Sequence, residues 1–167
     1  MLPAIRSSLA ALAVAAALAG AASAQQGTGV AFGGIRADTA LPVEVTADQL
    51  SVNQEDGSAT FSGNVVVGQG EMRLSAAEVR VEYAPEGRNR IERLHASGGV
   101  TLVSGAEAAE AQSAVYTIDS GEVVLSGEVL LTQGANTLAG QKLTVNLRTG
   151  TGIMEGRVRS VLQPGGN

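Results

Sequence analysis

The sequence predicts an all-β fold, built as a stack of antiparallel hairpins with one continuous inner surface. Three observations predict it: an internal repeat of about 29 residues, apolar residues at every second position within each repeat, and turn residues between successive apolar runs. A repeat of this length indicates a supersecondary unit that needs its neighbours to complete a core. A period of two places the apolar side chains of a strand on one face. Turn signals such as Asp56-Gly57 and Gln133-Gly134 separate the runs.

The repeat is clearest over residues 125–147, where a short strand marked by a glycine precedes a polar turn, Thr132–Asn136, and a second strand, Gln141–Leu147. The first half-repeat occurs four times, with its glycine at Gly63, Gly98, Gly127 and Gly156. The second half-repeat also occurs four times, at Ala47–Val52, Ala76–Val81, Ala111–Tyr116 and Gly140–Val145. One interval in each series is about six residues longer than the others, and it falls at the same place. It indicates an inserted loop at Ala84–Arg90.

Residues 1–24 are expected to be a secretory signal peptide that is removed from the mature protein. Arg6 supplies the positive charge, Leu9–Ala22 is an apolar run, and Ala22-Ser23-Ala24 is a cleavage site of the A-x-A type, ahead of Gln25. The alternative is an uncleaved membrane anchor. It is disfavoured because the run is short and rich in alanine compared with the ~20 strongly apolar residues of a spanning helix. The mature chain is therefore expected to be exported and soluble, with a length that suits one domain.

Residues 25–41 are rich in Gly, Ala, Thr and Gln and are expected to form a flexible N-terminal arm, although Val30–Phe32 and Ile35 could lie along a sheet edge. Residues 42–162 are expected to form the β domain, followed by a loose C-terminal tail at residues 163–167. The first strand (about 43–53) and the last (about 152–162) have no internal partner beyond them, so their edges are open to pairing with another chain. The candidate edge residues are Val45, Leu50, Val52, Val158 and Val161.

The amino-acid composition further limits the classes of function that the sequence allows. The chain has 16 acidic against 11 basic residues, which disfavours nucleic-acid binding. It has no cysteine, so a disulfide framework is unavailable. With two Phe, two Tyr and no Trp, the inner face must be built from Val, Leu, Ile, Ala and Met. Such a lining leaves open a narrow groove or an incompletely filled interior.

Catalysis, metal binding and a cofactor are not expected. A metal cluster of His and Cys ligands cannot be assembled from one histidine, and His95 is expected to be a surface or rim residue. The nucleophile motif G-x-S-x-G does not occur. Carboxylate pairs such as Glu55-Asp56 and Glu107/Glu110 fall in turns or outside the apolar phase, where solvation explains them better than acid–base work.

Two groups of basic residues stand out: Arg88, Arg90, Arg93 and His95 near the inserted loop, and Arg157 and Arg159 on the last strand. The simplest interpretation is a solvated face and protection of an edge. The alternative is contact with anionic head groups or with an acidic partner strand.

Several motifs, taken in order, resemble the OstA-like family. They are PVEVTADQLSV at Pro42–Val52, ATFSGNVVV at Ala59–Val67, AAEVRVEY at Ala76–Tyr83, and the repeated x-S-G-x-V strands behind a signal peptide. Each motif is short, and their order and spacing over residues 42–162 carry the resemblance. The acidic balance of the chain departs from what strong phosphate binding would need.

The resemblance implies a twisted β-jelly roll that is open at both ends and has a hydrophobic interior. It implies a periplasmic protein of lipopolysaccharide transport, in which the acyl chains of lipid A travel inside while the sugars remain in water. It also implies end-to-end strand pairing with further copies and with the inner-membrane-anchored and outer-membrane components of the transport machinery.

On this interpretation, inward apolar residues at alternating positions bind the lipid. The candidates are Val65, Val67, Leu74, Val79, Val81, Val100, Leu102, Tyr116, Leu125, Val129, Leu131, Leu143 and Val145. The alternative for each is that it fills a closed core. Two other classes of function stay open at this point: an exported structural β-solenoid or scaffold without lipid cargo, and a carbohydrate-active enzyme on a β-helix.

Overall fold

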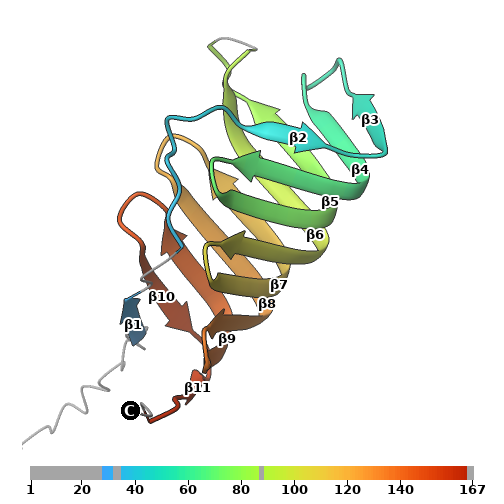
Figure 1. Ribbon diagram of the computed structural model, residues 1–167. Coiled ribbons are helices and arrows are strands. Elements are labelled where there is room, and N and C mark those ends of the chain that lie inside the picture. The colour runs from blue at the N-terminus through green and yellow to red at the C-terminus, as the bar shows by residue number, and fades with distance from the viewer. Residues whose placement is uncertain (1–27, 32–34, 87–88, 165–167) are drawn as a thin grey trace, which may run out of the picture.

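The computed structural model describes residues 28–31, 35–86 and 89–164 (Figure 1). The described residues form one antiparallel sheet and contain no helix, so the expected all-β fold is confirmed. The strands are β1 (Thr28–Ala31), β2 (Glu44–Thr46), β3 (Gln49–Val52), β4 (Ala59–Gln69), β5 (Met72–Tyr83), β6 (Ile91–Ser104), β7 (Glu107–Thr117), β8 (Glu122–Gln133), β9 (Asn136–Asn146), β10 (Thr151–Glu155) and β11 (Arg159–Val161). The expected signal peptide, residues 1–24, lies outside the described residues.

The six long strands, β4 to β9, bend in the middle, so that the sheet folds over into two facing halves (Figure 1). The first half-sheet begins at β3, which pairs with the start of β4, and ends at β10 and β1. The second half-sheet begins at β2, which pairs with the end of β4, and ends at β11 on β9. This arrangement is the twisted, open β-jelly roll built from repeated hairpins that the sequence predicts.

The repeat glycines mark the corners at which the strands bend. Gly63, Gly98 and Gly127 have φ of +80°, +81° and +86°, and the residue after each also has a positive φ. The pairing register shifts at the same places, for example between Ser126 and Val129, as a β-bulge requires. The sequence predicts one short strand for each glycine half-repeat. The structure shows that it comprises both arms of a longer, bent strand, because the ladder resumes beyond the bulge.

The same corner splits the terminal strands. The predicted first strand becomes β2 and β3, and the predicted last strand becomes β10 and β11, with Gly156 at φ +81° between the latter two.

A side chain is excluded at each corner by its neighbour as well as by its dihedral angle. A Cβ at Gly98 would lie 2.6 Å from Cβ of Ala77, and one at Gly127 would lie 2.8 Å from Oε1 of Gln112. The residues that face Gly63, Gly98, Gly127 and Gly156 are Asp48, Ala77, Gln112 and Gln141. These four occupy the same position in successive second half-repeats, so close packing of neighbouring corners explains why the glycine recurs.

The open side of the roll, opposite the corners, carries two rows of hairpin turns, and we call it the mouth. Its first row contains the turns at residues 118–121 and 147–150, and its second row those at residues 70–71, 105–106 and 134–135. Residues 35–41 lie across the mouth, between β1 and β2 (Figure 1). The sequence predicts a flexible arm at residues 25–41, with a sheet edge as the alternative. Residues 28–31 take the edge placement, paired with β10.

Candidate functional site

The thirteen residues predicted to line the interior come together between the two half-sheets. Six lie on the first half-sheet and seven on the second, and none exposes more than 2 % of its surface. All belong to a single apolar cluster. The period of two in the sequence therefore places these side chains on one inner face, as expected. Their contact with lipid stays a prediction.

Sequence reasoning missed other members of this cluster. Met72, Leu94, Val123, Leu138 and Met154 are also buried in it. Most follow the alternation already seen: Leu94 stands two residues before Ala96, and Val123 two before Leu125. Ile35 belongs to the cluster too, but its segment has no periodicity that would have indicated burial.

One polar contact crosses the interior near the mouth. Tyr116, on the first half-sheet, donates its hydroxyl to Oε1 of Gln69, on the second, at 2.6 Å. Burial raises the pKa of Tyr116, against the smaller opposing effects of Arg148 and of this hydrogen bond. The amide group of Gln69 donates in turn to the carbonyls of Thr39 and Leu41. Tyr116 and Gln69 therefore form a fixed polar contact at the mouth end of the apolar lining.

The predicted partner edges lie at the two ends of the roll. Leu50 and Val52 on β3 expose 54 % and 62 % of their surface, and Val161 on β11 exposes 51 %. Val45 on β2 is half-buried and packs against the core. Val158 is exposed but lies at the corner between β10 and β11 rather than in a strand. At this end β1 covers the outer edge of β10, so the terminal strands are β1 and β11.

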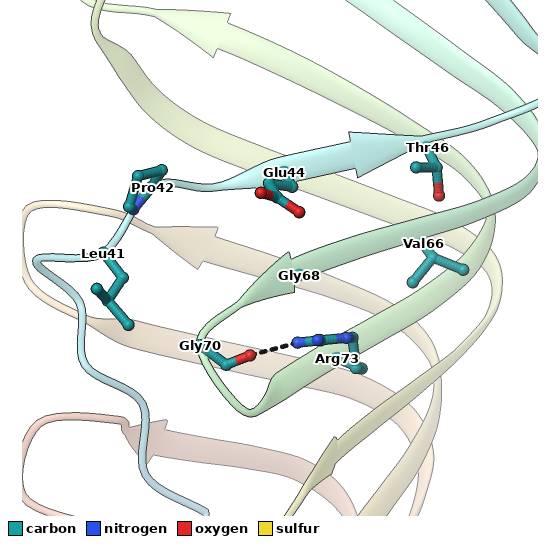
Figure 2. A pocket seen from close by; sticks show the side chains of 8 residues that line it. All are labelled: Leu41, Pro42, Glu44, Thr46, Val66, Gly68, Gly70 and Arg73. Atoms are coloured by element: carbon teal, nitrogen blue, oxygen red, sulfur yellow. Dashed lines mark hydrogen bonds between the residues drawn. The ribbon is translucent and has the colours of Figure 1, made fainter.

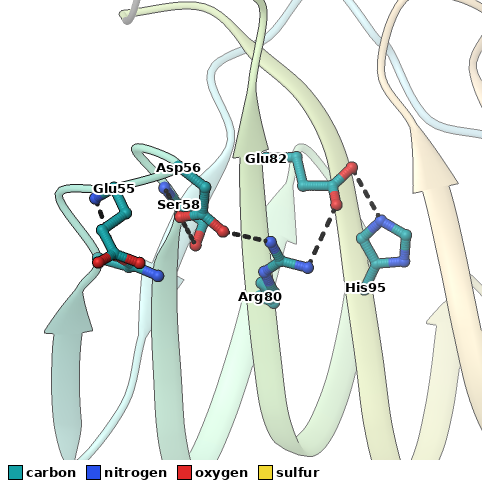
Figure 3. Close-up of polar contacts among 7 residues, drawn as sticks. Glu55, Asp56, Ser58, Arg80, Glu82 and His95 are labelled. Carbon is teal, nitrogen blue, oxygen red and sulfur yellow. Dashed lines mark hydrogen bonds and ion pairs between the residues drawn. The ribbon is translucent and has the colours of Figure 1, made fainter.

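The outer face of the first half-sheet carries a row of alternating charges (Figure 3). Arg80 lies 2.8 Å from Asp56 and 3.5 Å from Glu82, and Nε2 of His95 lies 3.1 Å from Oε2 of Glu82. The His95 contact has the distance of an ion pair but lacks the alignment of a hydrogen bond. Hydrogen bonds from the Ser58 hydroxyl and amide, and then Arg80, lower the pKa of Asp56. His95 is thus a surface residue, as its sequence context predicts.

The charged side chains that the structure describes on the surface meet the needs of neither a metal site nor a strong ion pair. Within the described residues, no three His, Cys, Asp or Glu side chains lie close enough together to hold a metal ion. Arg90 lies 3.3 Å from Asp119 and Arg93 lies 3.5 Å from Glu92, in exposed pairs. Exposed pairs of this kind contribute ~0–1 kcal/mol, so they act mainly as solvated surface. Arg88 lies outside the described residues.

A hollow of about 390 Å³ lies outside the roll, where β2 meets the β4–β5 turn (Figure 2). Its lining residues are Leu41, Pro42, Glu44, Thr46, Val66, Gly68, Gly70 and Arg73. Arg73 is held there by the carbonyl oxygens of Gly70 and Met72. None of the thirteen predicted lining residues borders this hollow, so it is separate from the apolar interior.

Fold and site together define an open antiparallel β-jelly roll, with an apolar interior between two half-sheets and strand edges at both ends. The part of the chain that the structure describes has no helix long and apolar enough to cross a membrane. A family model described as LptA/(LptD N-terminal domain) LPS transport protein matches residues 44–151. The chain belongs to this family of lipopolysaccharide transport proteins, which confirms the resemblance noted in its motifs.

Individual relatives agree with this assignment. The chain is 31 % identical to an uncharacterised protein of Rhizobium meliloti (strain 1021), over 96 % of this chain and 91 % of the relative. It is 28 % identical to the lipopolysaccharide export system protein LptA of Escherichia coli (strain K12), over 66 % of this chain and 62 % of that protein. LptH of Pseudomonas aeruginosa, an LptA homologue and periplasmic component of the lipopolysaccharide transport device, has the same fold. Its crystal structure matches with a TM-score of 0.68 at 22 % identity, over 77 % of this chain and 99 % of LptH.

Proposed function

We propose that this protein is a periplasmic carrier of lipopolysaccharide that holds the acyl chains of lipid A between its two half-sheets. The observation that carries the proposal is the continuous apolar face on each half-sheet, running the whole length of the roll. The thirteen residues named above form the contact surface for lipid. Burial of an acyl chain in such a lining gains roughly 0.8 kcal/mol per methylene group.

The lining suits movement as well as binding. It consists of Val and Leu in repeated positions, and Tyr116 is its only aromatic member. Repeated, chemically similar positions have similar free energies, so no single position along the lining holds the acyl chain more tightly than the others. Sugars and phosphates would remain at the mouth. There the exposed side chains of Arg36 and Arg148 donate hydrogen bonds to carbonyl oxygens of the turns.

We further propose that the roll pairs end to end with other copies and with the inner-membrane-anchored and outer-membrane components of the transport machinery. Support comes from the exposed apolar side chains on β3 and β11, at opposite ends of the sheet. Edge strands with unpaired backbone groups favour pairing with another strand. LptH is a periplasmic component of the lipopolysaccharide transport device, and this supports a periplasmic location for this chain.

Photo-crosslinking tests the lipid-binding proposal. The full chain is expressed in a Gram-negative host with a photo-crosslinking residue at Leu131, which is fully buried and faces inward. Leu130, the preceding residue of the same strand, faces outward and serves as the matched control. Lipopolysaccharide adducts are expected at position 131 and not at position 130.

Mass spectrometry of the purified wild-type protein gives an independent measure, and near-stoichiometric lipopolysaccharide or lipid A is the expected result. Lipid-free protein that also binds no added lipid A, with crosslinks from position 131 only to protein, would contradict the proposal. That outcome would favour the structural scaffold.

A further inference from the structure

Residues 35–41, which we call the strap, are bonded to both rows of turns at the mouth (Figure 1). Three hydrogen bonds join the strap to the first row: Ala37 N to Leu147 O (3.1 Å), Arg36 Nη2 to Thr149 O (2.8 Å) and Arg148 Nε to Thr39 Oγ1 (3.0 Å). Four join it to the second row: Ile35 N to Glu107 Oε2 (3.2 Å), Ser104 Oγ to Arg36 O (2.7 Å), and Gln69 Nε2 to Thr39 O (3.2 Å) and to Leu41 O (2.8 Å). The strap therefore ties the two half-sheets together at their open side.

Three of the four buried polar side chains in the described residues are placed for this contact. In the described part of the chain, the buried polar or charged residues are Ser58, Gln69, Ser104 and Glu107. Ser58 belongs to the hydrogen-bonded turn at Asp56. The other three all bond the strap. A buried polar group without a hydrogen bond costs free energy. The positions of Gln69, Ser104 and Glu107 are therefore explained by their hydrogen bonds to a segment of backbone.

Two side chains of the strap contact the apolar interior: Ile35, and Ala37, which is partly buried and packs against the cluster. Ile35 is fully buried and belongs to the same apolar cluster as the thirteen predicted lining residues. Leu41, at the other end of the strap, is 43 % exposed. The strap thus resembles a bound ligand, with one fully buried apolar group in the interior and backbone groups hydrogen-bonded at the rim.

We propose that the place filled by Ile35 is the access site for an acyl chain of the cargo, and that the strap leaves the mouth when lipid enters. The inference rests on the proposed function. The rest of the wall is held by backbone ladders. Among the described residues, the strap has one backbone-to-backbone hydrogen bond to another segment, from Ala37 to Leu147, and its other bonds involve side chains. An acyl chain offers the apolar surface that Ile35 offers, so the two compete for one position. The polar groups released at the mouth then face water.

A disulfide lock tests the proposal. A Cβ at Gly121 would lie 3.2 Å from Cγ2 of Thr39 and 3.1 Å from Cγ of Arg148. Gly121 has φ +68°, so Gly121→Cys costs backbone strain, which the oxidised and reduced forms of the double variant share. The chain contains no cysteine, so Thr39→Cys with Gly121→Cys places a unique pair across the strap and the first row. Delipidated protein is mixed with lipid A, and the bound lipid is measured over time. We expect uptake to be at least about tenfold slower in the oxidised double variant, because uptake scales with the open fraction, and reduction should restore it. Thr39→Cys alone is the control.

Hydrogen exchange on the unmodified protein gives a second readout that does not depend on the variants folding. The amides of Ile35 and Ala37 donate to Glu107 and Leu147, so both should exchange faster after lipid A is added. Unchanged exchange at both amides in lipid-loaded protein, or equal uptake by oxidised and reduced double variant, would overturn the strap proposal alone. Wild-type protein that takes up no lipid A would instead overturn the function on which it rests.

Discussion

The hydroxyl of Tyr116 reaches across the interior to Gln69, and this 2.6 Å hydrogen bond joins the two half-sheets directly beneath the mouth. Gln69 also holds the carbonyls of Thr39 and Leu41, so one buried side chain connects the lining, the second half-sheet and the strap. Any change that separates the half-sheets must break or stretch this connection. Tyr116 is therefore expected to affect both the stability of the fold and the opening of the roll.

Replacement of Tyr116 by Phe should destabilise the protein by about 1–3 kcal/mol at neutral pH, because Oε1 of Gln69 loses its buried donor. The free energy of unfolding in urea measures this. Tyr83→Phe is the control, since Tyr83 is only partly buried. An equal loss in both variants would show that the Tyr116 contact has no special role.

The same residue predicts an alkaline limit to stability. The pKa of Tyr116 is raised by burial, so its neutral form is favoured in the folded state. Below the unfolded pKa of ~10 both states are neutral and stability is unaffected; above it the unfolded state ionises first, and stability falls as the pH rises towards the folded pKa. Unfolding free energies between about pH 8 and 11 should decline less steeply in Tyr116→Phe than in the wild type. Parallel curves would contradict this.

The corner glycines offer a matched pair of adjacent positions. Gly98 and Gly99 have φ of +81° and +86°, but a Cβ at Gly98 would lie 2.6 Å from Ala77, whereas one at Gly99 would meet nothing within 4 Å. Both changes to Ala cost backbone strain of about 1 kcal/mol or more, and only Gly98→Ala adds a steric clash. Gly98→Ala should therefore have the lower melting temperature by several degrees, as scanning calorimetry would measure. Equal melting temperatures would refute the packing explanation for the repeat glycine.

An acid-dependent contribution is expected from the turn at Asp56. Its pKa is lowered, first by the hydrogen bonds from Ser58 and then by Arg80. A lowered carboxylate pKa contributes stability that is present above the unfolded value of ~3.9 and is lost as the pH falls through the folded value. Asp56→Asn should therefore lower the melting temperature at neutral pH, and the difference from wild type should shrink below about pH 4. Glu55→Gln removes a charge from the same turn and should not reproduce this pattern.

End-to-end assembly, which belongs to the proposed function, can be tested at the edge strand β11. Val161→Lys places a charge on an exposed edge residue, and should shift the protein towards the monomer in light scattering after gel filtration. Ile153→Lys is the control: Ile153 is similarly exposed, but its strand is paired on both sides, with β9 and with β1. A Val161→Lys protein with the wild-type mass distribution would show that β11 is not a pairing edge.

Much of this architecture could be predicted from local sequence patterns. The period of two placed all thirteen lining candidates on the inner face, because side-chain direction in a strand alternates whatever the strand packs against. The repeat spacing and the ordered motifs predicted the stacked hairpins and the family, both now confirmed. The sequence also placed His95 and its neighbouring charges on the surface, because they fall outside the apolar phase.

The corners and the mouth could be seen only in the tertiary structure. The repeated glycine was visible, but its role as a bend depends on the side chain that faces it from a neighbouring strand, such as Ala77 opposite Gly98. The strap depends on contacts between residues far apart in the chain: Ile35 meets Glu107 at a separation of 72 residues, and Thr39 meets Arg148 at 109. No periodicity marks such contacts, because a segment held by scattered partners needs no regular pattern of its own. Local alternation thus determined which residues face inward, and only the folded chain decided what closes over them.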